Sequence, residues 1–532
     1  MKKWQFLLVY FVFLSPACQE KEEDLRHFVG QKRDNPGSPP LNISRPELDE
    51  KWQKAQQSFQ DILNKDYSLG TIRQPIPGGS LAVVIDGKLH FSAGFGQRSL
   101  EDERRVEPDT VMTVGSLSKM ITALTALSMK DKGQLNLDQP INQYMKKRSF
   151  RFMRRMEDQE AADQITLNHS LFHTAGLPDE LPSGIEEFGK SVCTTGPDAY
   201  ESYFQRQKDS PLWALPGDVW NYSNANYFLA AAALEAAGQA SFEELSTTYV
   251  LERAGMKTAS WDAAQVEAAD NFALGYDYWV PYGEKLGLSS FQPSSTPCRI
   301  FRPAAGLHAS VIDFAALAES LLADKQNLLS EKTWKAFMTP QVKTFDEDYA
   351  YSYGNFIVED YKGLKVVGHD GISWGYSTVF MMVPEKRFAL VAFVQAGKTF
   401  STDLWSYALQ MVELFHNLPR GPRPAVKPVD HELQDVTGSF RGWTYDYENY
   451  SEANPSYAQL DVEISLDNGK LHWWDDWLGE AELKSLWWPK FRVAYPDASN
   501  NINVRFVRDA SGQVNYIVSR DFVAKRMEEE SE

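Results

Sequence analysis

A serine and a lysine three residues apart open an apolar run in "TVGSLSKMITALTALSMKDKG", which begins at Thr113. On a helix, Ser116 and Lys119 would share one face, a single turn apart. A serine near a helix N-terminus gains exposed backbone N–H groups that can stabilise an oxyanion, and a lysine held beside it can take the hydroxyl proton. The pair predicts nucleophilic catalysis by Ser116, although S-x-x-K alone also occurs on ordinary polar helix faces.

A tyrosine and an asparagine two residues apart precede the Ala-rich run of "PGDVWNYSNANYFLAAAALEAAG", which begins at Pro216. A tyrosine beside a lysine can pass a proton to a leaving group, and an asparagine amide can hold a substrate carbonyl. Tyr222 and Asn224 are therefore candidate partners of the serine and the lysine. The alternative is a loop tyrosine followed by an ordinary helix cap.

A histidine stands in "LFHTAGLPDE", residues 171–180. His173 is a candidate catalytic base because histidine titrates near neutral pH. We favour the other interpretation, in which it is a buried structural histidine that braces a loop.

The stretch "GHDGISWGYS" contains G-x-S-x-G, the nucleophile elbow of α/β-hydrolases, with Ser373 as its serine. An elbow needs a strand, a sharp turn and then a helix behind the serine. A β-hairpin pattern follows Ser373 instead. We therefore interpret this motif as coincidence and Ser116 as the nucleophile.

Taken in order, the motifs resemble those of the class C β-lactamase and penicillin-binding-protein superfamily of serine hydrolases. The resemblance rests on Ser116-x-x-Lys119, "HTAGLP", Pro216-Gly217 leading into Tyr222-x-Asn224, and "AAGLHASVIDFAALAESLL" from Ala304. It extends roughly from Trp52 to Leu418, and several motifs in the right order make chance agreement improbable.

The resemblance implies an α+β fold of the β-lactamase/transpeptidase-like type. Such a fold has an antiparallel sheet flanked by helices plus a helical subdomain, with the site in the groove between them. By this similarity Ser116 is the acylated nucleophile, Lys119 and Tyr222 handle protons, and Asn224 orients the substrate.

The family's third element is Lys-Thr-Gly on an edge strand, and its counterpart here is His369-Asp370-Gly371. A histidine variant resembles esterases, D-aminopeptidase-like enzymes and related peptidases of the superfamily. Lysine is a permanent cation suited to a substrate carboxylate, whereas histidine is largely uncharged near neutral pH. Gly371 would admit the substrate backbone, and the N–H of Ile372 would pair with that of Ser116 as an oxyanion hole.

These features together predict a serine hydrolase that acts through a Ser116 acyl-enzyme on an ester or an amide, including peptides with D-amino acids. The histidine disfavours, without excluding, the alternative of a β-lactamase or D,D-carboxypeptidase. A non-catalytic sensor that becomes acylated and an envelope binding protein are alternatives outside enzymes.

Several elements must position these residues. Apolar periodicity predicts a helix over residues 45–65, a hairpin over 79–96, a second hairpin over 377–395 and a helix over 401–418. The hairpin turns are Asp86-Gly87 and Pro384–Arg387. These elements predict one mixed sheet layer, with a helical insertion between the hairpins.

The proline-rich "NLPRGPRPAVKPVD" ends the large domain, predicted over residues 46–420, and leads through a linker at 421–430. Short alternating segments then predict a small β-barrel domain over 431–532, similar to the lipocalin-like barrels of some peptidase-like members. Six tryptophans fall in this tail: Trp443, Trp473, Trp474, Trp477, Trp487 and Trp488. We expect them to fill the barrel rather than to line a ligand pocket.

The N-terminus "MKKWQFLLVYFVFLSPACQ" has two lysines, a short apolar run and small residues before Cys18. This pattern predicts a signal peptide over residues 1–17, and it resembles the lipobox of bacterial lipoproteins, in which Cys18 is lipidated. Residues 18–45 would be a polar tether. We expect a periplasm-facing protein held in the bacterial envelope by the lipid alone, the alternative being cleavage that leaves Cys18 free.

The net charge of −18 argues against nucleic acid as a partner, because the electrostatic term would be repulsive. The basic run over residues 146–155 could bind anionic lipid or polymer, but a solvated loop face is the favoured interpretation. No histidine lies in H-E-x-x-H or beside paired cysteines, so we expect no metal and no cofactor. The expected partner is a small-molecule or peptide substrate. The pairing of Cys193 with Cys298 and the oligomeric state stay open.

Overall fold

The structure, a computed structural model, describes most of the chain beyond residue 45. It describes residues 46–64, 67–69, 72–74, 76–179, 196–279, 287–295, 299–324, 327–344, 348–397, 404–420, 430–446, 456–476, 479–487, 490–494, 502–509, 511–519 and 522–527. The predicted signal peptide, its Cys18 and the tether lie outside the described residues, as do Cys193 and Cys298.

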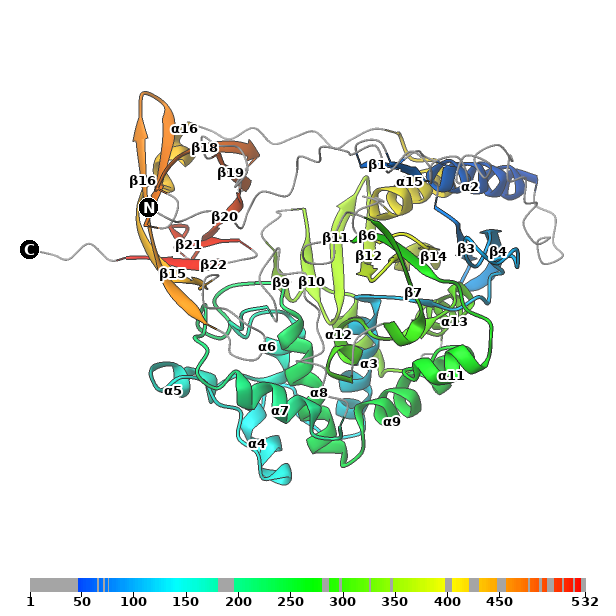
Figure 1. Cartoon of the computed structure of the whole chain (residues 1–532), viewed down its shortest axis with the longest axis horizontal. Coiled ribbons are helices and arrows are strands. Elements are labelled where there is room, and N and C mark those ends of the chain that lie inside the picture. The colour runs from blue at the N-terminus through cyan, green and yellow to red at the C-terminus, as the bar shows by residue number, and fades with distance from the viewer. Residues whose placement is uncertain are drawn as a thin grey trace, which may run out of the picture.

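Eight strands form the central sheet, in the order β4-β3-β14-β13-β12-β11-β10-β9 (Figure 1). Their bounds are Gly78–Ile85 (β3), Lys88–Gly96 (β4), Val342–Lys343 (β9), Ala350–Ser352 (β10), Asn355–Tyr361 (β11), Leu364–Ser373 (β12), Tyr376–Val383 (β13) and Phe388–Val394 (β14). Both predicted hairpins are confirmed, as β3–β4 and β13–β14. Asp86 and Gly87 take φ angles of 54° and 73°, as a tight hairpin turn requires. The sheet is antiparallel at each of its pairings, as the resemblance implied, rather than mixed.

Helices cover both faces of this sheet (Figure 1). One face carries α2 (Pro46–Asn64) and α15 (Leu404–His416), and the other carries α3 (Leu117–Asp131), α8 (Asn224–Gly238) and α13 (Val311–Leu321). Alternate residues of a strand face opposite sides, so Leu81 and Val83 pack with the first pair of helices while Ala82 and Val84 pack with the second group. The fold therefore has two apolar layers, separated by the sheet.

Short helices and strands fill the insertion between the two hairpins. They are α4 (Ile141–Met145), α5 (Gln159–Ala162), α6 (Leu167–Leu171), α7 (Ala199–Arg206), α9 (Phe242–Ser246), α10 (Glu252–Ala254), α11 (Ala263–Ala268), α12 (Arg302–Ala305), α14 (Glu331–Phe337), and the two-stranded pairs β5–β8 (Met112–Thr113, His308–Ala309) and β6–β7 (Gly275–Trp279, Gly287–Phe291). The predicted α+β fold with a helical subdomain is thus confirmed.

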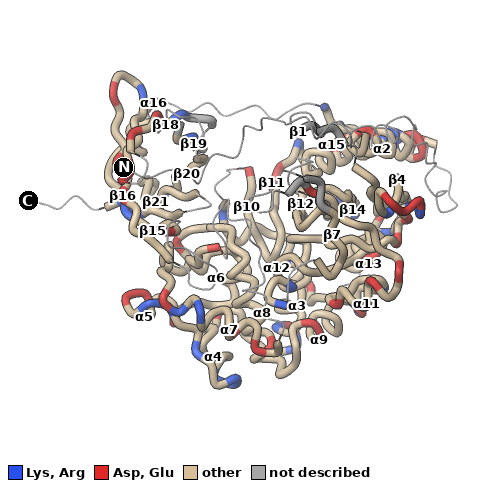
Figure 2. Tube along the Cα trace, in the orientation of Figure 1, with Lys and Arg blue, Asp and Glu red and all other residues tan. Residues whose placement is uncertain are grey.

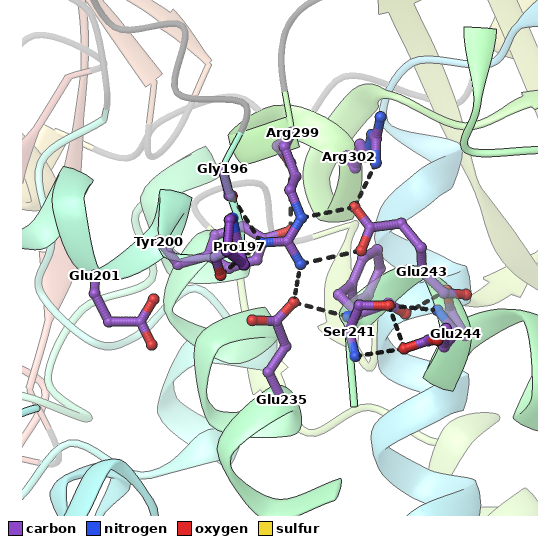
Figure 3. Close-up of polar contacts among 12 residues, drawn as sticks. Gly196, Pro197, Tyr200, Glu201, Glu235, Ser241, Glu243, Glu244, Arg299 and Arg302 are labelled. Atoms are coloured by element: carbon purple, nitrogen blue, oxygen red, sulfur yellow. Dashed lines mark hydrogen bonds and ion pairs between the residues drawn. The ribbon is translucent and has the colours of Figure 1, made fainter. Parts of the chain in front are cut away.

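A buried ion network ties several of these elements to α8 (Figure 3). Glu235, whose side chain is 1% exposed, pairs with Arg299 and with Arg148, whose Nη1 lies 2.5 Å from the carboxylate. Arg299 lies 3.1 Å from Glu243, which Arg302 approaches to 2.6 Å. Each of these buried or half-buried charges therefore faces the opposite charge, as burial requires.

The basic run over residues 146–155 lies between α4 and α5 (Figure 2). Arg148 lies 2.6 Å from Glu201, and Arg155 lies 2.6 Å from Asp158. Arg154 is itself buried. Lys146, Lys147 and Arg151 are exposed, as a solvated loop face would have them, whereas Arg148, Arg154 and Arg155 are engaged within the fold.

The C-terminal strands β15–β22 close into an antiparallel barrel, with each strand paired to the next (Figure 1). Their bounds are Gly438–Tyr445, Tyr457–Asp467, Lys470–Asp475, Gly479–Trp487, Lys490–Ala494, Ile502–Arg508, Val514–Val518 and Phe522–Arg526, after the short helix α16 (Asp430–Asp435). The predicted all-β barrel is confirmed, and eight strands in up-and-down order is the architecture that lipocalins have. Trp473 is buried in the barrel core, as predicted, whereas Trp474 is 43% exposed. No helix among the described residues is both long enough and apolar enough to span a bilayer.

Candidate active site

Ser116 occupies the N-cap position of α3, immediately before the first helical residue. Its Oγ accepts a hydrogen bond of 3.1 Å from the Nζ of Lys119, one turn further along. Gly115, with a φ of 57°, makes the turn into the helix, and a Cβ there would lie 2.7 Å from the carbonyl oxygen of Ile372. Only glycine therefore lets this turn approach strand β12 so closely.

Tyr222 and Asn224 reach the same point from the start of α8. The Oη of Tyr222 donates to the Oγ of Ser116 at 2.9 Å, and the Nζ of Lys119 donates to the Oδ1 of Asn224 at 2.6 Å. The Nζ of Lys119 also donates to the carbonyl of Ala304 at 3.0 Å. The structure thus brings together the four residues that the sequence singled out, although their motifs are about a hundred residues apart.

The protonation state of Tyr222 follows from its surroundings. Burial raises its pKa well above the ordinary value of 10, and the negative charges of Asp370 and Asp179 act in the same direction, against the hydrogen bond to Ser116. The Nζ of Lys119 lies 4.8 Å from the centre of the tyrosine ring. Tyr222 is therefore a neutral phenol near pH 7, and it is the donor toward the serine.

His173 is fully buried and takes a φ of 60°, an uncommon backbone conformation for a non-glycine residue. Its Nδ1 accepts a hydrogen bond of 3.2 Å from the backbone N–H of Ser223, and its ring centre lies 4.3 Å from that of Tyr222. Burial lowers its pKa well below 6.5, so it stays neutral. This geometry agrees with a structural histidine that braces the loop of Tyr222.

His369 lies on β12 with only 2% of its surface exposed, so it sits behind the site rather than on an open groove wall. Its ring centre is 4.8 Å from that of Phe356 and 6.0 Å from that of Tyr222. Burial, followed by the positive charge of Lys119, lowers its pKa from 6.5 to about 3. The family's permanent cation is thus replaced by a neutral imidazole.

The residues expected to form an oxyanion hole lie where β12 passes the start of α3. A Cβ on Gly371 would stand 3.2 Å from the backbone nitrogen of Ser116, and one on Gly115 would stand 2.9 Å from that of Ile372. The two N–H groups therefore border one close contact between strand and helix. The side chain of Ile372 is 48% exposed beside it.

Ser373 ends β12, and Gly375, with a φ of 73°, turns the chain directly into β13. No helix follows the serine, whose side chain is 91% buried and makes no hydrogen bond to the described residues. The rejection of a nucleophile elbow is confirmed.

Two groups of the site were not singled out from the sequence. The carboxylate of Asp179, 4% exposed, accepts a hydrogen bond of 2.8 Å from the backbone N–H of Asn224, and the carbonyl of Ala304 accepts from Lys119. The signal for Asp179 was its place in "HTAGLPDE" together with the unsatisfied N–H groups that every helix start exposes. Ala304 takes part through its backbone carbonyl, a group that every residue has, so its residue type gives no indication of the contact.

Metal ligands are not gathered anywhere in the part of the chain that the structure describes, where His, Cys, Asp and Glu form no group of three or more suited to an ion.

The sequence profile of the Beta-lactamase family matches residues 50–411, more than half of the chain. The chain belongs to the beta-lactamase family. Among curated relatives of this family member, unguisins hydrolase ungD' of Aspergillus campestris is 26% identical over 357 residues, which are 63% of this chain and 61% of that protein. Penicillin-binding protein 4* of Bacillus subtilis is 21% identical over 318 residues, 59% of this chain and 67% of that protein. The chain thus spans less than two thirds of the length of the unguisins hydrolase.

Solved structures share the fold of this beta-lactamase family member. SurE aligns over 90% of this chain and 100% of its own, with a TM-score of 0.63 at 21% identity. SurE has also been solved with D-Leu, and that structure aligns with a TM-score of 0.60. The octameric penicillin-binding protein homologue from Pyrococcus abyssi aligns over 90% and 100%, with a TM-score of 0.58 at 19% identity. At these identities the likeness concerns the fold.

Proposed function

We propose that this protein is a serine hydrolase that cleaves an ester or amide through an acyl-enzyme on Ser116. The observation that carries the proposal is the convergence of two proton-handling groups on one hydroxyl: Ser116 Oγ lies 3.1 Å from Lys119 Nζ and 2.9 Å from Tyr222 Oη. A nucleophilic serine needs a base within hydrogen-bond reach and a route for the proton to the leaving group. Both are present here.

In acylation, Lys119 in its unprotonated form takes the proton of Ser116 while the Oγ bonds to the carbonyl carbon of the substrate. The N–H groups of Ser116 and Ile372 stabilise the oxyanion, and Asn224 orients the substrate. When the bond to the leaving group breaks, Tyr222 gives its proton to that group and regains one from Lys119. The raised pKa of Tyr222 suits this role, because the phenol stays protonated until the leaving group needs the proton.

Deacylation repeats the steps with water. Lys119, again unprotonated, accepts the proton of a water molecule whose oxygen attacks the ester carbon. When the bond from this carbon to the Oγ of Ser116 breaks, Tyr222 gives its proton to the Oγ and regains one from Lys119. Ser116 thus leaves with a proton, which restores the starting state. An acceptor other than water would make the same site a transferase.

The neutral state of His369 indicates which class of substrate the site would bind. A buried imidazole whose pKa is about 3 offers no positive charge to a substrate carboxylate at neutral pH. We therefore favour ester and amide substrates in which the group bound beside β12 is uncharged. SurE, a protein of the same fold solved with D-Leu, supports peptides that contain D-amino acids as one such class. A β-lactamase or D,D-carboxypeptidase is the alternative.

Covalent labelling of the full chain tests the proposal. We expect a fluorophosphonate ester probe to label the wild type and the Ser373→Ala variant alike, and to leave Ser116→Ala unlabelled. Labelling that survives Ser116→Ala would disprove the assignment of the nucleophile. Labelling by a fluorescent penicillin as well would favour the β-lactamase or D,D-carboxypeptidase alternative.

Turnover separates an enzyme from an acylated sensor. With a chromogenic ester, a hydrolase releases product continuously, whereas a sensor releases about one equivalent and stops. We expect continuous release.

We also propose that Cys18 anchors the protein in the bacterial envelope by a lipid. The support is the lysine, apolar and small-residue pattern that precedes this cysteine. Metabolic labelling with palmitate is expected for the wild type and not for Cys18→Ala, and equal labelling of both would contradict the anchor.

A further inference from the structure

The loop that carries the catalytic tyrosine has no regular secondary structure of its own. Residues 207–223, all of which the structure describes, join α7 to α8 as turns and irregular segments. On the hydrolase side, backbone hydrogen bonds join this loop to residues 173–178: Gly217 donates to Thr174 at 2.7 Å, and Asn221 donates to His173 at 2.8 Å. Such a loop takes a fixed shape only through contacts with neighbouring elements.

Two tyrosines of the C-terminal barrel supply such contacts. Tyr445, fully buried at the end of β15, donates from its Oη to the carbonyl of Asp179 at 3.2 Å. Tyr516, on β21, donates to the carboxylate of Asp218 at 2.7 Å. The ring of Tyr445 also packs edge-on against Trp213, with ring centres 5.1 Å apart. The barrel therefore contacts both segments that border the site.

Each of these contacts leads to a catalytic residue in one further step. Asp179, which receives Tyr445 on its carbonyl, holds the backbone N–H of Asn224 with its carboxylate. Asp218, which receives Tyr516, follows Gly217, whose φ is 97°, and lies four residues before Tyr222.

An apolar cluster joins the same parts of the molecule. It consists of buried residues from the loop, from the sheet and from the barrel, with Tyr222 packed against it: Trp213, Ala214, Val219, Trp220, Tyr351, Tyr445, Tyr516, Val518 and Val523. One core is therefore shared between the catalytic loop and the barrel.

We propose that the barrel is a positioning element of the active site, in which Tyr445 and Tyr516 hold the loop that presents Tyr222 and Asn224 to Ser116. The inference rests on the proposed function and extends it to the second domain. If the barrel only packed against the hydrolase domain, it would not need tyrosine hydroxyls that donate hydrogen bonds to Asp179 and Asp218. Two other contacts do not reach residues 213–224: Trp443 lies over Arg155, outside the loop, and Tyr457 bonds at 3.1 Å to Gln207, the first residue of the loop and the C-cap of α7.

The test compares Tyr→Phe variants of the full chain, each of which removes one hydroxyl and keeps the ring. The experimental variant is the double change Tyr445→Phe and Tyr516→Phe. The docking control is Tyr457→Phe. The general control is Tyr407→Phe, because Tyr407 donates to the carbonyl of Ala55 at 3.1 Å within the apolar layer of α2 and α15, a bond of the same kind as that of Tyr445.

The measurement is the rate constant for acylation of Ser116 by a fluorophosphonate, taken across pH and well below the melting temperature. We expect the double variant to be slower by roughly tenfold, the factor that corresponds to one hydrogen bond of ordinary strength, with a shifted pH profile. Both controls should keep the wild-type rate and profile. A double variant at the wild-type rate, or a Tyr457→Phe variant that is equally slow, would overturn the proposal.

Hydrogen exchange tests the same idea without any reaction. Amides of residues 213–224 should exchange faster in the double variant than in Tyr407→Phe, and equal exchange would count against positioning. The outcome stays separate from that of the proposed function, because labelling of Ser116→Ala disproves the nucleophile whatever the tyrosine variants do.

Discussion

Helix α8 has a buried polar cluster near each of its ends. In one cluster the side chains have neutral partners, and in the other they have oppositely charged partners. At the N-terminus of the helix, Asn224 and Ser116 offer neutral oxygens to the Nζ of Lys119. Toward its C-terminus, Glu235 pairs with the guanidinium group of Arg299 (Figure 3) and with that of Arg148. Opposite charges at close range stabilise the charged forms of both partners. Neutral oxygens can instead accept a hydrogen bond from the lysine nitrogen whether or not it carries its third proton.

Under the proposed function, the comparison separates the helix into a catalytic end and a structural end. At the structural end the charges compensate each other and join α8 to α9 and α12. At the catalytic end the partners of the Lys119 Nζ are a hydroxyl, an amide and a peptide carbonyl, none of which carries a charge. Substitutions at the structural end should therefore change the free energy of unfolding, whereas substitutions at the catalytic end should change the acylation rate.

The largest expected effect is at Lys119. Lys119→Met keeps the length of the side chain and removes the base, so we expect the acylation rate constant to fall by about 10⁴-fold, the upper range for a general base. The acylation rate constant is measured from the kinetics of labelling with a fluorophosphonate. Circular dichroism shows that the variant is folded. A fall of less than about tenfold would remove Lys119 from the role of base.

Glu235→Gln tests the other end. It leaves Arg299 and Arg148 without their shared carboxylate, so we expect the free energy of unfolding to fall by about 3–5 kcal/mol, as measured in urea. The acylation rate of the folded variant should stay near that of the wild type. Glu331→Gln, which removes an exposed ion pair with Lys335, is the matched control and should change stability little. If the Glu235 variant lost its rate and kept its stability, the division of α8 would be wrong.

Tyr222→Phe should have a smaller effect on rate than the lysine variant. Without the hydroxyl, proton delivery to the leaving group is slowed, and we expect an acylation rate about 10²-fold lower, the lower range for such a group. Stability should change little, since the ring stays packed beside His173. Substrates with a good leaving group, such as nitrophenyl esters, should suffer less than amides. An equal loss for both would argue against a proton donor.

Acid should destabilise the folded protein through its buried histidines. His369 and His308 are buried, with pKa values lowered from 6.5 to about 3 and about 4. Below about pH 6.5 the unfolded chain binds protons that the folded chain does not, so stability falls as the pH decreases. Between pH 6.5 and 5 we expect a loss of about 1.5 kcal/mol from each histidine. Urea unfolding at several pH values measures it, and His308→Gln should reduce the slope; a stability that is constant over this range would contradict the prediction.

Local patterns were sufficient to predict much of this molecule. The three-residue spacing of Ser116 and Lys119 is set by helix geometry, and the turn at Asp86-Gly87 by the φ angles that a two-residue hairpin loop requires. Such features depend on neighbours in sequence, which a single chain displays directly.

Contacts between distant segments were not predictable in this way. The burial of His369 depends on Phe356, Tyr351 and Tyr222, which come from two other strands and a loop. The carboxylate of Asp179 acts on Asn224 only because their two segments meet in space. Residue types suggested the participants of the site, while their distances and protonation states followed from the tertiary structure.

The order of strands in the sheet also has a consequence for the time course of folding. Strand β3 lies between its own hairpin partner β4 and β14, so Ala82 pairs with both Ser92 and Val391. The second of these contacts closes a very long loop, and contacts of high sequence separation form slowly. We therefore expect that, during synthesis, the edge of β3 that faces β14 stays unpaired until β14 has been made. The barrel strands follow in sequence order, each pairing with its predecessor, and can assemble soon after they are synthesised.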